Sequence, residues 1–123
     1  MASESEQVVT RFIDAWPRKN IEELLAFFTD DAVYHNIPLQ PAKGKEAIRA
    51  AINTFLPLAK SVEFKVLHSA AAGNTVINER VDIFDMNGKR VELPVAGVFE
   101  IRGGKIAAWR DYFDMAMFTK QMA

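Results

Sequence analysis

Cysteine is missing from this chain of 123 residues, and histidine occurs only at His35 and His68. Without cysteine the chain can form no disulfide, no thiolate nucleophile and no cysteine-ligated zinc site. The two histidines lie far apart and lack the repeated spacing of metal ligands, so the sequence predicts no metal site. A metal hydrolase would need a histidine beside its carboxylates, yet alternation along a strand places His35 on the face opposite Tyr34 and Asn36.

Long hydrophobic runs and runs of one charge are also missing. No apolar stretch approaches the ~20 residues that a membrane-spanning helix needs. The N-terminus has neither the basic start nor the apolar segment of a signal peptide. The 15 basic and 16 acidic residues give a net charge of -1 without a basic run, which argues against nucleic acid or a membrane surface as a partner. We therefore expect a soluble, cytoplasmic protein.

The length and the composition, 50% hydrophobic and 25% charged, predict one globular domain over residues 1–123. Apolar residues recur at helical spacing in the first half, and a strand ended by Pro38 interrupts them. The helices expected there, with a last one at the C-terminus, are 4–16, capped by Ser3 or Ser5, 20–29, capped by Asn20, 45–56 and 115–122.

From Ser61 onward the sequence alternates as strands do, with turns at 70–74, at Asn87-Gly88 and at 102–105. The strand from Lys89 to Ile101 contains Pro94 and Gly97, which predict a bulge or a strong bend. Helices followed by an antiparallel meander predict an α+β fold, with one curved sheet wrapped around the helices. The mouth of such a cone is a natural ligand cavity.

The strand near residue 80 carries the residues that suggest chemistry. Asn78, Arg80 and Asp82 share one face with Phe84, and Ile77, Val81 and Ile83 share the other face. If both faces are covered, the apolar face is ordinary core and the polar face lines a cavity. Buried charges are nearly always paired or used. The alternative is an open strand face with a surface ion pair.

The last strand supplies a second carboxylate. Asp111 shares a face with the rings of Trp109 and Phe113, and desolvation between them would raise its pKa unless a cation compensates. Arg80 is the candidate cation. Asp82 and Asp111 bring two negative charges and Arg80 one positive, so a single proton neutralises a buried set. One protonated and one ionised aspartate are an acid and a base side by side.

No motif pairs a side-chain nucleophile with a base, so water is the better candidate nucleophile. Tyr34, Asn36 and the ionised carboxylate could hold it. Taken alone, Tyr34 also fits a core ring with a satisfied hydroxyl, and Asn36 a turn residue before Pro38.

Four motifs in register resemble the limonene-1,2-epoxide hydrolases over nearly the whole chain. They are Tyr34-His35-Asn36-Ile37-Pro38, Glu79-Arg80-Val81-Asp82, Gly97-Val98-Phe99 and Trp109-Arg110-Asp111-Tyr112-Phe113-Asp114. The resemblance implies an NTF2-like/SnoaL-like cone, a homodimer, and cofactor-free hydrolysis of an epoxide to a vicinal diol in one step. It also implies that Asp111 is the base on a water held with Tyr34 and Asn36, that Asp82 is the acid, and that Arg80 bridges them.

The resemblance leaves the substrate open beyond a small apolar epoxide and water. The apolar residues expected to line the pocket belong to no motif: Leu39, Phe55, Leu56, Met86, Val95, Phe99 and Phe118. The methionines of the tail, Met115, Met117 and Met122, could form an adaptable pocket wall or plain packing and dimer contacts.

Two rival functions remain from the sequence. A ketosteroid-isomerase-like or polyketide-cyclase-like enzyme needs one base and an oxyanion stabiliser, and has no use for Arg80 between two aspartates. A non-catalytic binding module has no reason to bring Asp82, Arg80 and Asp111 together in an apolar pocket. Side chains that pointed to solvent, or aspartates too far apart to share Arg80, would exclude the hydrolase.

Overall fold

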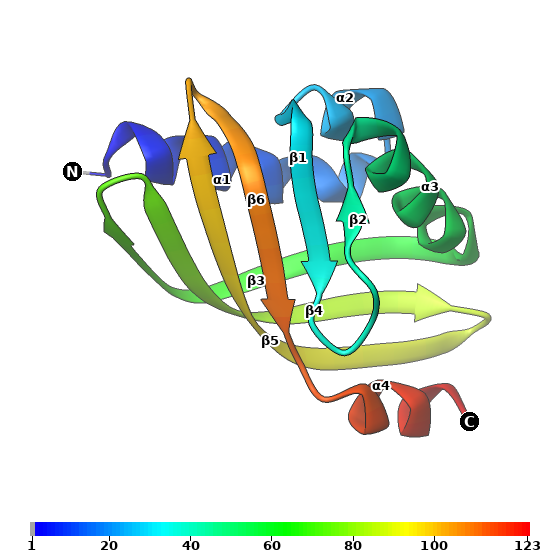
Figure 1. Cartoon of the computed structure of the whole chain (residues 1–123). Helices are drawn as coiled ribbons and strands as arrows, with labels where there is room; N and C mark the ends of the chain where they lie inside the picture. The colour runs from blue at the N-terminus through cyan, green and yellow to red at the C-terminus, as the bar shows by residue number, and fades with distance from the viewer. Residues whose placement is uncertain (1) are drawn as a thin grey trace.

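A computed structural model describes residues 2–123, and in that part of the chain helices pack inside a curved, unclosed six-stranded sheet (Figure 1). The helices are α1 (Glu4–Ala15), η1 (Trp16–Arg18), α2 (Ile21–Leu25), α3 (Lys45–Phe55), η2 (Leu56–Leu58) and α4 (Met115–Met122). The strands are β1 (Phe28–Asn36), β2 (Ala42–Lys43), β3 (Ala59–Ala72), β4 (Thr75–Met86), β5 (Lys89–Arg102) and β6 (Lys105–Tyr112). The predicted α+β class is confirmed.

The sheet is mixed and has the strand order β2-β1-β6-β5-β4-β3. Strands β3 to β6 form the expected antiparallel meander, but β1 pairs with β6 in parallel. A parallel pair needs a crossover connection, and the chain from α3 through β5 supplies it. This pairing sets Tyr34 opposite Trp109 and Asn36 opposite Asp111.

Helix α1 begins at a capping box, in which the Glu6 amide donates to Ser3 Oγ and the Ser3 amide to Glu6 Oε1. Its apolar stripe enters the concave side of the sheet, where Phe12 is fully buried. The Phe12 ring lies edge-on to five others at centroid distances of 5.0 to 6.2 Å, namely Trp16, Phe27, Phe28, Phe99 and Trp109. This cluster closes the narrow end of the cone and fixes the strands behind the site.

Two expected boundaries were wrong. Helix α2 starts at its predicted cap, Asn20, but ends at Leu25, and Phe28 already belongs to β1. The Ile106 amide donates to the Phe27 carbonyl at 2.8 Å, so pairing with β6 overrides the helical pattern there. Strand β3 continues to Ala72 where a turn was expected, because alanines fit a paired strand as well as a loop.

Strand β5 carries Pro94 and Gly97, for which the sequence predicts a bulge or a strong bend, and the structure has the bend (Figure 1). Its register with β4 is unbroken from end to end, and the shift in its register with β6 follows Glu100, beyond both residues. Only its second half pairs with β6. The Glu92 amide points away from β4 and donates to Gln121 Oε1 of α4, so Pro94, two residues on, lacks an N–H only on that same open edge.

Only one face of β4 is covered, so the condition under which its apolar face would be core is not met. Ile77 is 51% exposed, and Val81 and Ile83 are only partly buried. The helices cover only the concave side of the sheet, so the polar face of β4 is the buried one and the apolar face is outermost. Among residues 2–123, no helix is long and apolar enough to cross a membrane.

Candidate active site

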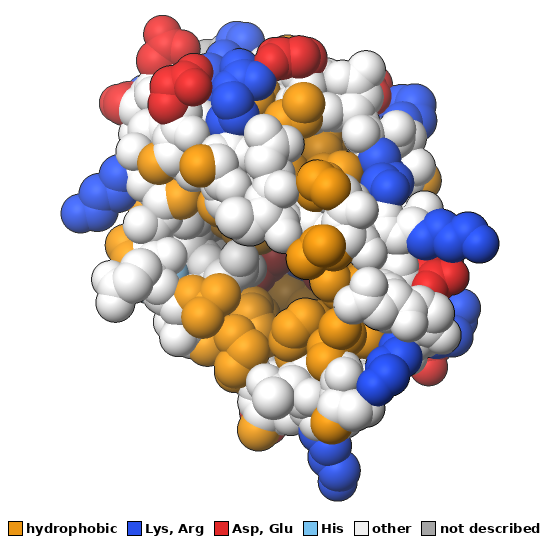
Figure 2. Space-filling view, turned by 90° about the vertical axis from the view of Figure 1, so that its right-hand side faces the viewer, with side chains coloured by type: hydrophobic (Ala, Val, Ile, Leu, Met, Phe, Trp, Pro, Cys, Tyr) orange, Lys and Arg blue, Asp and Glu red, His pale blue; other side chains and the backbone are white. Residues whose placement is uncertain are grey.

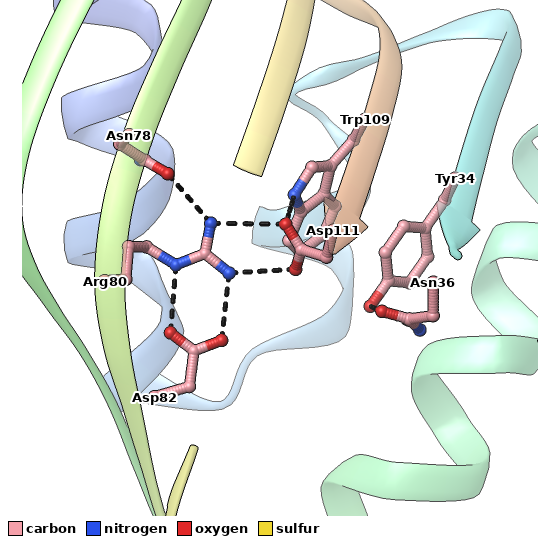
Figure 3. Close-up of polar contacts among 7 residues, drawn as sticks. All are labelled: Tyr34, Asn36, Asn78, Arg80, Asp82, Trp109 and Asp111. Atoms are coloured by element: carbon pink, nitrogen blue, oxygen red, sulfur yellow. Dashed lines mark hydrogen bonds and ion pairs between the residues drawn. The ribbon is translucent and has the colours of Figure 1, made fainter. Parts of the chain in front are cut away.

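Arg80 occupies the centre of the site and is fully buried. Its Nε and Nη2 donate to the two oxygens of Asp82, both at 2.9 Å. Its Nη1 and Nη2 donate to the two oxygens of Asp111, at 3.2 and 2.8 Å. The remaining Nη1–H donates to Asn78 Oδ1 at 3.0 Å, so all five N–H groups of the guanidinium have acceptors (Figure 3).

The strand geometry explains why these groups meet. Asn78, Arg80 and Asp82 alternate onto the concave face of β4, and Asp111 points inward near the end of β6. All four side chains are nearly inaccessible to solvent. The open-face alternative for this strand is therefore excluded.

Tyr34 and Asn36 come from β1, next to Asp111. The Tyr34 ring stacks on Trp109, with centroids 4.2 Å apart and planes 14° from parallel. Its hydroxyl exchanges hydrogen bonds with Asn36, which donates through Nδ2 at 3.0 Å and accepts through Oδ1 at 3.2 Å. Trp109 Nε1 donates to Asp111 Oδ1 at 2.7 Å. Among residues 2–123, only Arg80 donates to the Oδ2 atom of Asp111, which leaves that oxygen able to accept a further hydrogen bond.

A cavity of about 310 Å³ leads to this cluster, and its mouth is rimmed by hydrophobic side chains (Figure 2). Asp82, Asp111, Tyr34 and Asn36 all line it, whereas Arg80 lies behind the carboxylates. Four of the apolar residues expected from the sequence also line it: Leu39, Phe55, Val95 and Phe118.

The other three expected lining residues need correction. Leu56, Met86 and Phe99 are outside the cavity wall and belong to the buried core. Phe99 shares the concave face of β5 with Val95 but lies farther along, against Phe12 and Trp109. Leu56 follows the last turn of α3, and Met86 lies where β4 ends against Ala59. Each is apolar and close to a site residue in the sequence, but the sequence does not reveal whether its side chain faces the cavity or the core.

Sequence reasoning missed several wall residues, among them Trp16, Ile52, Phe64, Phe84 and Leu93. Alternation could have found two of them, because Phe84 and Leu93 lie two residues from Asp82 and Val95 on the same faces. Phe64 is the cross-strand neighbour of Asp82, and its ring lies 5.0 Å from the Arg80 guanidinium carbon. That pairing depends on the register of β3, which has two shifts that the sequence does not reveal.

Comparison with known proteins gives the family. Residues 3–123 match the limonene-1,2-epoxide hydrolase catalytic domain. Epoxide hydrolase EphG of Mycobacterium tuberculosis is 31% identical over 107 residues, which cover 87% of this chain and 71% of that protein. This chain belongs to the limonene-1,2-epoxide hydrolase family. The resemblance drawn from the four motifs is confirmed.

Solved structures agree with the family and the fold. An M. tuberculosis epoxide hydrolase similar to limonene-1,2-epoxide hydrolases superimposes with a TM-score of 0.85 at 30% identity, covering 96% of this chain and 88% of that one. A Shewanella putrefaciens protein described as a SnoaL-like polyketide cyclase gives a TM-score of 0.89 at 15% identity, covering 99% and 98%. The second match shows the fold alone, which is the NTF2-like/SnoaL-like cone expected from the resemblance.

In this member of the limonene-1,2-epoxide hydrolase family, burial sets the protonation of the site. Burial raises the pKa of Asp82 to about 6, although hydrogen bonds and charge from Arg80 oppose the rise. Burial likewise raises the pKa of Asp111 against the opposing effects of Arg80 and Trp109. Burial lowers the pKa of Arg80, but the two carboxylates outweigh it and the net shift is upward.

The remaining polar groups add a neutral donor and no metal site. Burial, and then the Asp111 charge, raise the pKa of Tyr34, which stays a neutral phenol. No group of three or more metal-ligating side chains occurs within residues 2–123. The chemistry that these residues can perform is proton transfer, because burial raises the pKa of both carboxyl groups and both line the cavity.

Proposed function

We propose that this protein adds water to an epoxide in one step and releases a vicinal diol. The observation that carries the proposal is the pair of buried carboxylates, Asp82 and Asp111, that share one arginine at the inner end of an apolar cavity. Hydrolysis of a strained ring needs a base for the water and an acid for the ring oxygen at the same time. The family match supports the same reaction class.

In the proposed mechanism, ionised Asp111 is the base and its Oδ2 accepts a proton from the attacking water. Tyr34 and Asn36 hold that water; their mutual hydrogen bonds and their place on the strand beside Asp111 support this role. The water oxygen attacks one epoxide carbon and its C–O bond breaks. Protonated Asp82 gives its proton to the ring oxygen, so the diol leaves with both hydroxyls neutral.

The protons then balance without any other reactant. After the reaction Asp111 holds the water's proton and Asp82 is ionised, the reverse of the starting state. Arg80 contacts both carboxylates, so it stabilises either arrangement, and return of the proton resets the enzyme. Water and the epoxide suffice, and the proposal includes no cofactor.

The cavity favours an apolar epoxide. Its walls are mainly aromatic and aliphatic, and among residues 2–123 the charged side chains that line it are Asp82 and Asp111. An ionised carboxylate on the substrate would enter without a cation of its own, because Arg80 already has five acceptors. We also propose, from the family resemblance, that the protein is a cytoplasmic homodimer.

The experiment that tests the function is diol formation from limonene oxide, cyclohexene oxide and styrene oxide, with Asp111→Asn as the matched control. We expect diol from the wild type and none above background from the variant. In water labelled with oxygen-18, a single turnover should already place the label in the diol, since no enzyme ester forms. Diol from the variant, or an unlabelled first product, would contradict the mechanism. No diol with any epoxide, together with proton exchange on ketones, would favour a carbon-acid enzyme.

A further inference from the structure

The guanidinium of Arg80 reaches its second carboxylate across a strand. Arg80 belongs to β4 and Asp111 to β6, and β5 runs between them. Gly97 of β5 is the register partner of Asn78 on one side and of Asp111 on the other. The hydrogen bonds of Arg80 to Asn78 and to Asp111 therefore pass over Gly97, which has no side chain.

The space above Gly97 is already full. A Cβ atom at this position would lie within 3.0 Å of Arg80 Nη1, Asn78 Oδ1 and Asp111 Oδ1. Real Cβ atoms essentially never come so close, and none of the three atoms is the free end of a flexible chain, because each is buried and hydrogen-bonded. Gly97 is not among the glycines with positive φ, so the backbone does not require glycine there. Space requires it.

Asn78 fills the one place around the guanidinium that the carboxylates leave open. It accepts the fifth N–H of Arg80 and is 2% exposed. An apolar residue would leave that buried donor unpaired. A carboxylate would give the cluster a third negative charge against one positive, and a second proton would have to bind. A neutral acceptor is the choice that keeps one proton on Asp82 and Asp111.

We propose that Gly97 and Asn78 are positioning residues, which together hold the Arg80 guanidinium where it contacts both carboxylates at once. This inference rests on the proposed function for its kinetic consequence, but not for its structural one. Neither residue touches the cavity. Both act through Arg80: Gly97 by leaving room for the guanidinium, and Asn78 by fixing its rotation.

The first test is a double-mutant cycle on diol formation. We expect Gly97→Ala to lower kcat by about 10²-fold or more, the cost of a displacement near 1 Å at reacting groups. Asn78→Ala should lower kcat on the order of tenfold, the worth of one lost hydrogen bond. KM should change little for either, because the cavity wall is intact. The double variant should be no worse than Gly97→Ala, since one guanidinium carries both effects. Additive losses, or losses in KM alone, would overturn the proposal.

Asn78→Asp supplies the conservative rescue. It keeps an oxygen acceptor beside Arg80, so at low pH, where the added carboxyl is protonated, it should be more active than Asn78→Ala. As the pH rises, this advantage should disappear, because the new group faces Asp82 and Asp111 with only Arg80 to offset them. Equal activity of the two Asn78 variants at every pH would overturn the role given to Asn78.

The second test needs no turnover, so it separates this inference from the proposed function. Carbon-13 NMR of labelled aspartate carboxyls gives the titration of Asp82 and Asp111 in wild type and in Gly97→Ala. We expect both to titrate at higher pH in the variant, because the cation has moved away. Ile101→Val, at another inward-facing, buried position of β5, is the control that disturbs packing and leaves the titration unchanged. Unchanged titration in Gly97→Ala, or the same shift in Ile101→Val, would overturn the proposal.

Discussion

Asp82 and Asp111 accept hydrogen bonds from the same nitrogen, Nη2 of Arg80, at 2.9 and 2.8 Å. Two carboxylates that share one cation cannot ionise independently, because each lost proton leaves the second harder to remove. The pair therefore holds one proton over a range of pH, so an acid and a base coexist in one buried site. The proposed chemistry depends on that single proton.

The most direct prediction concerns the two carboxylates. In the proposed mechanism, Asp111→Asn removes the acceptor of the water's proton and Asp82→Asn removes the donor to the ring oxygen. Each substitution should lower kcat by about 10² to 10⁴, with the circular dichroism spectrum unchanged. A variant that keeps wild-type turnover would refute the role given to that residue.

Arg80 should not be replaceable by lysine. A guanidinium donates five hydrogen bonds in fixed directions, whereas an ammonium donates three from one atom. Arg80→Lys keeps the charge but can serve only part of the set formed by Asp82, Asp111 and Asn78. We expect kcat to fall by about 10²-fold and the midpoint of urea unfolding to fall. Activity close to wild type would show that charge alone suffices.

The buried pair should also make stability depend on pH. Burial raises the pKa of Asp82 from 3.8 to about 6, so the folded state binds this proton more tightly than the unfolded state. The resulting stability is complete below pH 3.8 and is lost as the pH rises to about 6. The loss corresponds to roughly 3 kcal/mol.

Urea unfolding between pH 4 and pH 8 measures this effect when Asp82→Asn is run beside the wild type. The difference in the free energy of unfolding between the two proteins isolates the contribution of Asp82 from that of the exposed ion pairs. In the pair of Arg18 with Glu23, for example, the pKa of the carboxyl is lowered, so its contribution to stability has the opposite pH dependence. We expect the wild type to lose stability relative to the variant as the pH rises through this window. A gain would mean that Arg80 outweighs burial at Asp82.

The sequence predicted the site better than its surroundings, and strand periodicity explains why. Alternation alone puts Asn78, Arg80 and Asp82 on one face and sets Asp111 with Trp109, so the local pattern already contains the cluster. Their convergence, however, depends on strand order, and only the family resemblance supplied it. Strand alternation also does not indicate which aspartate is the acid and which is the base; that assignment came from the family resemblance as well.

The cavity wall was harder to predict because it depends on long-range packing. Phe99 and Val95 share one face of β5, yet one fills the core and the other lines the cavity, since α1 covers only the part near Phe99. The parallel pairing of β1 with β6 joins segments some 75 residues apart. Propensity over a short window carries no information on such contacts.

Helix α4 should act as an adjustable wall of the cavity. No residue of α4 is fully buried, although Met115 and Phe118 line the cavity. Gln121 holds the helix by two hydrogen bonds to the Glu92 backbone, at 2.8 and 2.9 Å. Gln121→Ala should loosen this wall and raise KM several-fold with little change in kcat, whereas Lys120→Ala, one residue earlier, should change neither. Equal effects of the two substitutions would argue that Gln121 has no such role.

The two buried tryptophans allow a comparison between an indole N–H that donates a hydrogen bond and one that does not. Trp109 Nε1 donates to Asp111 at 2.7 Å, whereas Trp16 Nε1 is buried and has no partner among residues 2–123. Replacement by phenylalanine removes similar apolar surface from both sites, so the difference between the two variants reports on the N–H. A hydrogen bond to a charged group is worth about 1.5 to 3 kcal/mol, and removal of an unsatisfied donor is favourable. Trp109→Phe should therefore unfold at a lower urea concentration than Trp16→Phe.

Trp109→Phe should also raise the pKa of Asp111, because the carboxylate loses a hydrogen-bond donor. In the pH profile of diol formation, the loss of activity on acidification should then begin at a higher pH than in the wild type. Equal destabilisation with an unshifted pH profile would show that this bond contributes nothing to the base.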